Sequence, residues 1–271
     1  MICATTNTFV IFNLVGYQNI TLNDQQTSGG FTYLTRTLPA IGKDKTILTL
    51  GDFTVASTDG LAGQDSVNIH TYGASGLETG NYSYLDQAAI DNNGFPCEPG
   101  WYEYDSINDY RFVSANDALL PFGTGVMIIS DYGAEICCAG EVMRTSADFE
   151  LNNQQTSGGF TYLGNCSPVN ITLKDIAVIS TDGLAGQDSV NIHTYGASGL
   201  ETGNYSYLDQ AAIDNNGFPC EPGWYEYDSI SDYSFINAGN TPIASGEMFM
   251  VISDYGATIS IPAPIPTGSE G

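Results

Sequence analysis

The stretch STDGLAGQDSVNIHTYGASGLETGNYSYLDQAAIDNNGFPCEPGWYEYDSINDY, residues 57–110, occurs a second time at residues 180–233. The only difference between the two copies is the replacement of Asn108 by Ser231. The copies begin 123 residues apart, at 57 and 180. That spacing exceeds the roughly 20–50 residues of a solenoid repeat and matches the size of an independent domain. The chain is therefore predicted to contain two copies of one domain.

The duplication extends beyond this block on both sides. Residues 25–34 match residues 154–163, and residues 128–134 match residues 251–257. The segment between the first match and the block is longer in the first copy, as expected of a loop. We place the boundary near Met143, which predicts one domain over residues 1–143 and a second over residues 144–271.

Each copy is built from short runs of β-branched and aromatic residues, separated by turn signals such as Asp59-Gly60. These runs predict strands in the first copy at Val10–Val15, Asn19–Leu22, Phe31–Leu34, Thr46–Leu50, Val67–Tyr72, Tyr82–Leu85, Trp101–Tyr104 and Gly125–Ser130. The single helical candidate, Tyr84–Ile90, is a turn or two long. The pattern predicts an all-β fold of two tandem antiparallel domains, sandwich-like or barrel-like, and disfavours a nucleotide-binding parallel sheet.

The charge of the chain restricts its partners. It carries 31 acidic and 6 basic side chains, a formal net charge of −25. Such a charge repels a phosphate backbone, so nucleic acid is excluded as a partner. The longest apolar runs, Phe9–Phe12 and Val126–Ile129, are far too short to span a membrane.

Six cysteines indicate an oxidising compartment, and so a secreted protein, because none has the spacing of a zinc site. If disulfides stay within domains, Cys97 pairs with Cys137 or Cys138, and its equivalent Cys220 pairs with Cys166. Cys3 is then unpaired, as is whichever of Cys137 and Cys138 does not bond to Cys97. We expect these two to meet either within the first domain or across subunits.

The repeated block is rich in acidic turns and contains no Lys or Arg. Carboxylate and amide oxygens are the ligands that calcium takes, although the EF-hand spacing is absent. The alternatives are a calcium site and solvated turns that keep the protein soluble. The candidate ligands are Asp91, Asn93, Asp105, Asp109, Asp214, Asn216, Asp228 and Asp232.

The motif Trp-Tyr-Glu-Tyr interleaves aromatic and acidic residues at 101–104 and again at 224–227. In a strand, alternate residues face opposite sides, so one side of each motif belongs to the core. The other interpretation is a sugar-stacking platform beside carboxylates. Its candidate contacts are Trp101, Tyr102, Trp224 and Tyr225.

Signs of catalysis are weak. His70 and His193 occupy equivalent places, and one histidine in each copy supplies neither a triad nor a metal cluster, so we interpret both as strand residues. Glu98 and Glu103 could pair as acid and base, but two identical active sites in tandem are rare in enzymes. We predict a protein that is not an enzyme and that needs no cofactor, calcium being the one candidate ion.

Both ends of the chain are candidates for assembly contacts. The run Phe9, Val10, Ile11 and Phe12 is apolar and β-prone, and it pairs either inside its own domain or with the sheet of a neighbouring molecule. From Ile259 to Pro266 the chain alternates Ile, Pro and Ala, which predicts an extended tail that lies along a partner or ends free. Ile259, Ile261 and Ile265 are its candidate contacts.

The first copy resembles β-rich repeat modules of secreted bacterial surface proteins, which begin with a GYxN strand and place a proline-glycine turn before a late apolar strand. The residues that carry this are Gly16-Tyr17-Gln18-Asn19-Ile20-Thr21-Leu22, Tyr33-Leu34, Val67–Tyr72, Trp101–Tyr104 and Pro121–Ile128. The second copy departs at Thr145-Ser146 and Ala244. The tandem repeat and the two ends are also similar to subunits of extracellular filaments and sheaths. These resemblances imply a surface location and a structural role, and transfer no site.

Taken together, these features predict a secreted structural subunit that self-assembles into an extracellular filament, sheath or lattice, by strand addition or by stacking of the two near-copies. Its partner is then a second copy of the chain. The alternative is a bivalent cell-surface adhesin or carbohydrate-binding protein, in which two equal sites gain avidity for glycans.

Overall fold

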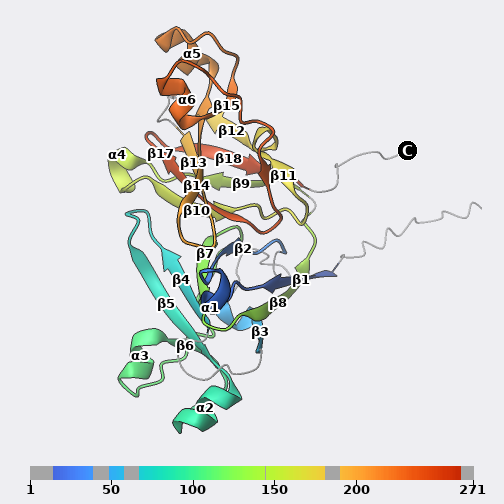
Figure 1. Ribbon diagram of the computed structural model, residues 1–271, viewed down its shortest axis with the longest axis vertical. Coiled ribbons are helices and arrows are strands. Elements are labelled where there is room, and N and C mark those ends of the chain that lie inside the picture. The colour runs from blue at the N-terminus through green and yellow to red at the C-terminus, as the bar shows by residue number, and fades with distance from the viewer. Residues whose placement is uncertain (1–14, 39–48, 58–66, 144, 181–189, 264–271) are drawn as a thin grey trace, which may run out of the picture.

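The computed structural model describes residues 15–38, 49–57, 67–143, 145–180 and 190–263 (Figure 1). Strands dominate this part of the chain, and all the strand pairings in it are antiparallel. The all-β prediction is therefore confirmed. The division near Met143 stays a prediction, and we use it below to define a first and a second repeat.

The first repeat forms a five-stranded and a three-stranded sheet. The larger has the order β2 (Phe31–Thr35), β7 (Gly125–Ser130), β4 (Val67–Tyr72), β5 (Glu78–Leu85), β6 (Gly100–Glu103). The smaller has the order β1 (Val15–Thr21), β8 (Ala134–Glu141), β3 (Thr54–Ser57). The connections contain α1 (Gln25–Ser28), the 3-10 turn η1 (Leu50–Asp52), α2 (Gln87–Asn93) and α3 (Tyr104–Asn108).

The second repeat has the same two sheets. The five-stranded sheet has the order β10 (Phe160–Gly164), β17 (Met248–Ser253), β13 (Val190–Tyr195), β14 (Glu201–Leu208), β15 (Gly223–Glu226). The three-stranded sheet has the order β9 (Ala147–Glu150), β18 (Ala257–Ile261), β12 (Ala177–Ser180). A two-stranded sheet, β11 (Ile171–Thr172) with β16 (Pro242–Ile243), is added. Its helices are α4 (Gln154–Ser157), η2 (Leu173–Asp175), α5 (Gln210–Asn216) and α6 (Tyr227–Ser231).

Each hydrophobic core lies between the large and the small sheet of one repeat. Alternation along β4 points Val67 and Ile69 inward, where they pack with Trp101 and with Ile136 of β8. All four side chains are at most 1% exposed. The second core repeats the arrangement around Trp224. The core therefore uses only one side of each large sheet, and the opposite side does not contribute to it.

The predicted helix Tyr84–Ile90 begins later than expected, because Tyr84 and Leu85 belong to β5. Asp86 is the N-cap of α2, where its side chain accepts a hydrogen bond from the Ala89 N–H at 2.7 Å. Gly94, in the left-handed conformation at φ 65°, ends the helix. In Figure 1, α2 and α3 lie at one end of the molecule and α5 and α6 at the other.

The extended tail does not begin at Ile259, as the sequence suggested. Ile259 and Ile261 belong to β18, the central strand of its sheet, and both are 0% exposed. Their side chains fill their own core and cannot reach a partner in this arrangement. Ile265 and the run Phe9–Phe12 lie outside the described residues.

Candidate functional site

The outer side of each large sheet carries a histidine. Because Val67 and Ile69 face the core, Asn68 and His70 face the opposite side of the sheet. The identical sequence of β13 places Asn191 and His193 in the same way. Both histidines are 8% exposed.

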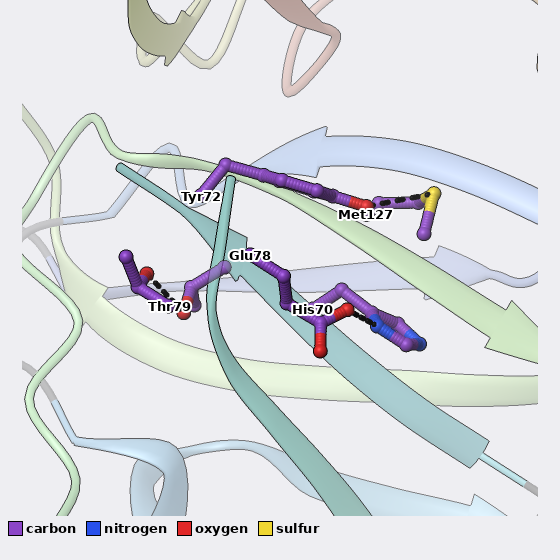
Figure 2. Close-up of polar contacts among 6 residues, drawn as sticks. His70, Tyr72, Glu78, Thr79 and Met127 are labelled. Atoms are coloured by element: carbon purple, nitrogen blue, oxygen red, sulfur yellow. Dashed lines mark hydrogen bonds and ion pairs between the residues drawn. The ribbon is translucent and has the colours of Figure 1, made fainter. Parts of the chain in front are cut away.

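A β-bulge brings a glutamate to each histidine. His70 lies directly opposite Asn81 and Thr71 opposite Gly80, but Tyr72 lies opposite Glu78 because the register shifts by one residue. Without the shift, Thr79 would occupy the outer side in place of Glu78. As a result His70 Nδ1 is 2.6 Å from Glu78 Oε2 (Figure 2).

The second repeat reproduces this pair. The same register shift occurs after Thr194, and His193 Nδ1 is 2.7 Å from Glu201 Oε2. The glutamates are nearly half exposed, whereas the histidine side chains are 11% exposed. Each glutamate therefore holds its imidazole ring in place from the solvent side and leaves Nε2 to point elsewhere.

Two polar atoms at this site are buried without a hydrogen-bond partner in the described part of the chain. They are the histidine Nε2 and the Oδ1 of the asparagine opposite, at His70 and Asn81 and again at His193 and Asn204. An unsatisfied buried polar atom costs about 1–3 kcal/mol, so native proteins seldom retain one without a use. The same two atoms recur in both repeats, and a hydroxyl group or a water molecule in the site would satisfy them.

In the second repeat His193 and Asn204 belong to the lining of a pocket of about 440 Å³. It is lined by Gln154, Asn191, His193, Asn204, Tyr227, Ile252 and Asp254. The corresponding residues of the first repeat are Gln25, Asn68, His70, Asn81, Tyr104, Ile129 and Asp131, and all of them are identical. The lining comes from three separate segments of the duplication, which the fold brings together.

Strand β7 and its equivalent β17 show which side of the sheet the duplication preserves. On the core side the residues differ, with Val126 replaced by Phe249 and Ile128 by Val251. The outer-side residues Met127 and Ile129 recur unchanged as Met250 and Ile252. In this strand the core was repacked while the pocket side was kept.

A tyrosine flanks each site towards the other repeat. The Tyr72 hydroxyl donates to the Met127 sulfur at 3.5 Å, as Figure 2 shows, and Tyr195 lies 3.7 Å from the Met250 sulfur. Burial, followed by the neighbouring glutamate, raises the pKa of both phenols to about 12. Both therefore remain protonated hydrogen-bond donors at neutral pH.

The lining determines which ligands the pocket accepts. The amide, hydroxyl and imidazole groups both donate and accept hydrogen bonds, the Asp254 carboxylate accepts them, and the described lining contains neither lysine nor arginine. Nothing there compensates the charge of a phosphate or a carboxylate. The site suits a neutral ligand with several hydroxyl groups.

The aromatic residues predicted to stack on glycans belong to the interior. Trp101 and Trp224 are 1% and 2% exposed, and Tyr102 and Tyr225 are 7% and 5% exposed. The Tyr102 hydroxyl donates to the Glu98 carbonyl at 2.7 Å. The core interpretation of the Trp-Tyr-Glu-Tyr motif is therefore the one the structure supports.

The candidate calcium ligands serve local roles. Asp91 accepts from Gln87 at 2.8 Å, Asn93 donates to the Ala89 carbonyl at 2.8 Å, and Asp109 pairs with Arg111 at 3.1 Å. Asp214 and Asn216 make the same two contacts in α5, whereas Asp105, Asp228 and Asp232 are residues of α3, α6 and its C-cap. Over residues 15–38, 49–57, 67–143, 145–180 and 190–263, no three acidic, histidine or cysteine side chains gather as a metal site.

The predicted disulfides are not formed. Cys97, Cys137, Cys138, Cys166 and Cys220 are free, and Cys3 lies outside the described residues. Cys97 packs with Phe95 and Phe112 in a cluster beside α2, whereas Cys138 lies in the main core of the repeat. Cys220 and Cys166 are separated in the same way. Spacing in sequence could not reveal that the partners belong to different clusters.

Helices in the described ranges are too short or too polar to cross a membrane. Comparison with protein-family models, with curated proteins and with solved structures finds no match to this chain.

Proposed function

We propose that this protein is a bivalent carbohydrate-binding protein of a cell surface, with one pocket for a neutral sugar in each repeat. The observation that carries the proposal is that His193 and Asn204, whose Nε2 and Oδ1 atoms have no hydrogen-bond partner, line a polar pocket. The same pair recurs at His70 and Asn81. This function is the alternative that the sequence offered. The proposed sugar contacts, however, lie on the outer side of the sheet and not at the tryptophans.

Sugar hydroxyls match this chemistry. A hydroxyl that donates its one proton to Asn204 Oδ1 can accept a hydrogen bond from His193 Nε2 if that nitrogen carries a proton, and a second hydroxyl donates to Nε2 if it does not. One or two hydroxyls therefore satisfy both atoms. The volume of about 440 Å³ lies in the lower part of the usual range for ligand pockets, which fits one or two sugar rings. The net charge of −25 further disfavours anionic ligands.

Two equal pockets on one chain have a consequence for surface attachment. Weak sites that engage a multivalent surface together gain affinity by about 10²–10⁴-fold over one site. Individual sugar sites of modest affinity would then be sufficient for adhesion. The proposed role is attachment to a glycan-bearing surface.

The proposal is tested on an array of immobilised neutral glycans with the full-length protein. The His70→Leu/His193→Leu variant should lose binding at least tenfold, and it should fold, because leucine removes the unsatisfied Nε2 atoms. Thr71→Val/Thr194→Val is the matched control. These threonines are adjacent in sequence but face the other side of the strand, where they bond Thr79 and Thr202 at 3.1 and 3.0 Å. Absence of any binding by the wild type, or equal binding by both variants, would reject the proposal.

A further inference from the structure

The two repeats contact each other through the same residues on both sides. The Phe31 N–H donates to the Ala197 carbonyl at 3.2 Å, and the equivalent Phe160 N–H donates to the Ala74 carbonyl at 3.1 Å. Each hairpin between the third and fourth strands of a large sheet thus reaches the edge strand of the other repeat. The contact has the reciprocity of a two-fold symmetric dimer interface, although it lies within one chain.

Glycines allow this close approach. A Cβ atom on Gly158 would lie 2.5 Å from the Ala74 carbonyl oxygen, and one on Gly29 would lie 2.7 Å from that of Ala197. Both glycines have a positive φ, 101° and 96°, that other residues rarely adopt. The hairpin contact therefore depends on glycine at both positions.

Aromatic rings make the second reciprocal contact. The ring centroids of Tyr33 and Tyr195 are 5.3 Å apart, and those of Tyr72 and Tyr162 are 5.1 Å apart. In each pair, one tyrosine lies on the edge strand of one repeat, β2 or β10. The other tyrosine lies on the strand of the other repeat that carries the histidine, β13 or β4. At such distances aromatic pairs contribute about 0.5–1.5 kcal/mol beyond the burial of their area.

At the centre of the junction the symmetry is broken. There each residue meets its own counterpart, and the counterparts differ in size. Gly125 of β7 lies against Met248 of β17, and Gly164 of β10 lies against Thr35 of β2. A Cβ on Gly125 would meet the Met248 side chain and would lie 2.7 Å from the Leu163 carbonyl oxygen.

The size difference makes the junction selective. A first repeat facing another first repeat would oppose Gly125 to Gly125 and leave the space of the Met248 side chain empty. Two second repeats would oppose two Met248 side chains in a space that holds one. Only a first repeat with a second repeat fills the centre.

We propose that this junction is a head-to-tail joint that also forms between molecules, so that the chain polymerises with further copies of itself. None of the contacts above requires the two repeats to be covalently connected. Few residues separate β8, which ends at Glu141, from β9, which begins at Ala147, and a short connection favours exchange of whole repeats between chains. An exchanged assembly that does not close into a ring has an unpaired first repeat at one end and an unpaired second repeat at the other, and it continues to grow.

The test uses the full-length chain, unfolded in urea and refolded at concentrations from about 1 μM to about 1 mM, the upper value matching a typical effective concentration for linked modules. Light scattering after gel filtration should show monomers at the lowest concentration. At the highest, a series of dimers, trimers and larger oligomers should make up more than half of the protein. A monomer at every concentration would overturn the proposal.

Selectivity is tested with the Gly125→Met/Met248→Gly variant, which exchanges the large and the small residue. Donor-labelled and acceptor-labelled wild-type chains refolded together at high concentration should give energy transfer. Wild type mixed with the exchanged variant should give at least fivefold less energy transfer, because each mixed joint opposes two glycines or two methionines. Equal transfer in the two mixtures would refute the selective joint, and if the variant does not fold, the wild-type concentration series alone decides. Neither measurement involves glycans, so both are independent of the proposed sugar binding.

Discussion

The two repeats have one outer surface in common but differ at some core positions and at the junction. Beside Trp101 the first core has Phe53, and the second has Ile176 at the equivalent position. At the junction, Gly125 of the first repeat corresponds to Met248 of the second. Core positions accept a change of residue if volume is conserved nearby, whereas a ligand site depends on particular atoms. The comparison is informative in strands β7 and β17, where the core side changed and the pocket side did not, as a ligand site on that side would require.

The largest expected effect concerns the two cores. Trp101→Ala and Trp224→Ala should each reduce the free energy of unfolding by about 3–5 kcal/mol, because each removes a large buried side chain. The chain has 2 tryptophans, so each variant retains the reporter of the other repeat. Urea unfolding followed by fluorescence and by circular dichroism measures both. If the two losses of unfolding free energy differ by more than about 2 kcal/mol, the two cores are not equivalent.

The junction should weaken at alkaline pH. Burial raises the pKa of Tyr72 and Tyr195 from the ordinary 10.0 to about 12, so in the unfolded chain these phenols ionise first. Their contribution to stability is complete below pH 10 and is lost as the pH rises towards 12. Tyr72→Phe/Tyr195→Phe should flatten this loss, measured as urea midpoints between pH 9 and 11.5. If the variant and the wild type lose stability in parallel, these phenols do not control the junction.

A smaller difference separates the two tryptophans. Trp101 Nε1 donates to the Phe53 carbonyl at 3.4 Å, whereas Trp224 Nε1 is buried without a partner in the described residues. Trp101→Phe should therefore cost about 1 kcal/mol more than Trp224→Phe, since only the first loses a hydrogen bond. Paired urea titrations measure the difference. The reverse order would contradict it.

The smallest effect is expected at Glu247, whose counterpart is Thr124. Burial raises the pKa of this carboxyl, which accepts a hydrogen bond from the Ala244 N–H at 2.7 Å. A raised pKa means that its contribution to stability is present at acid pH and is lost as the pH rises past the ordinary 4.5. Glu247→Gln should be more stable than wild type at pH 7 by less than about 1 kcal/mol, and the advantage should disappear near pH 4. An advantage that grows on acidification would contradict this sign.

The sequence was sufficient to predict the class of fold. The runs Val67–Tyr72 and Gly125–Ser130 are strands with the predicted bounds, because β-branched residues between turn signals have few alternatives. The prediction of a tail from Ile259 onward is wrong, because the prolines that favour an extended end lie beyond Ile261, whereas Ile259 and Ile261 alternate with polar residues as in a half-buried strand.

The pocket could not be predicted in the same way. The sequence predicts only that its histidine is a strand residue, because the partner Glu78 is eight residues away and faces His70 only through the register shift at Thr71. A regular hairpin would have placed Thr79 there. Local pattern does not encode such a shift, and the recurrence of both residues in the second copy was the one available signal.

The most direct test of the central claim is the number of sugars bound per chain. Calorimetric titration of the full-length protein with the glycan that binds best on the array should give two equivalent sites for the wild type. His70→Leu and His193→Leu should each give one site of unchanged affinity. A single site in the wild type, or two sites remaining in either variant, would contradict the equivalence of the two pockets.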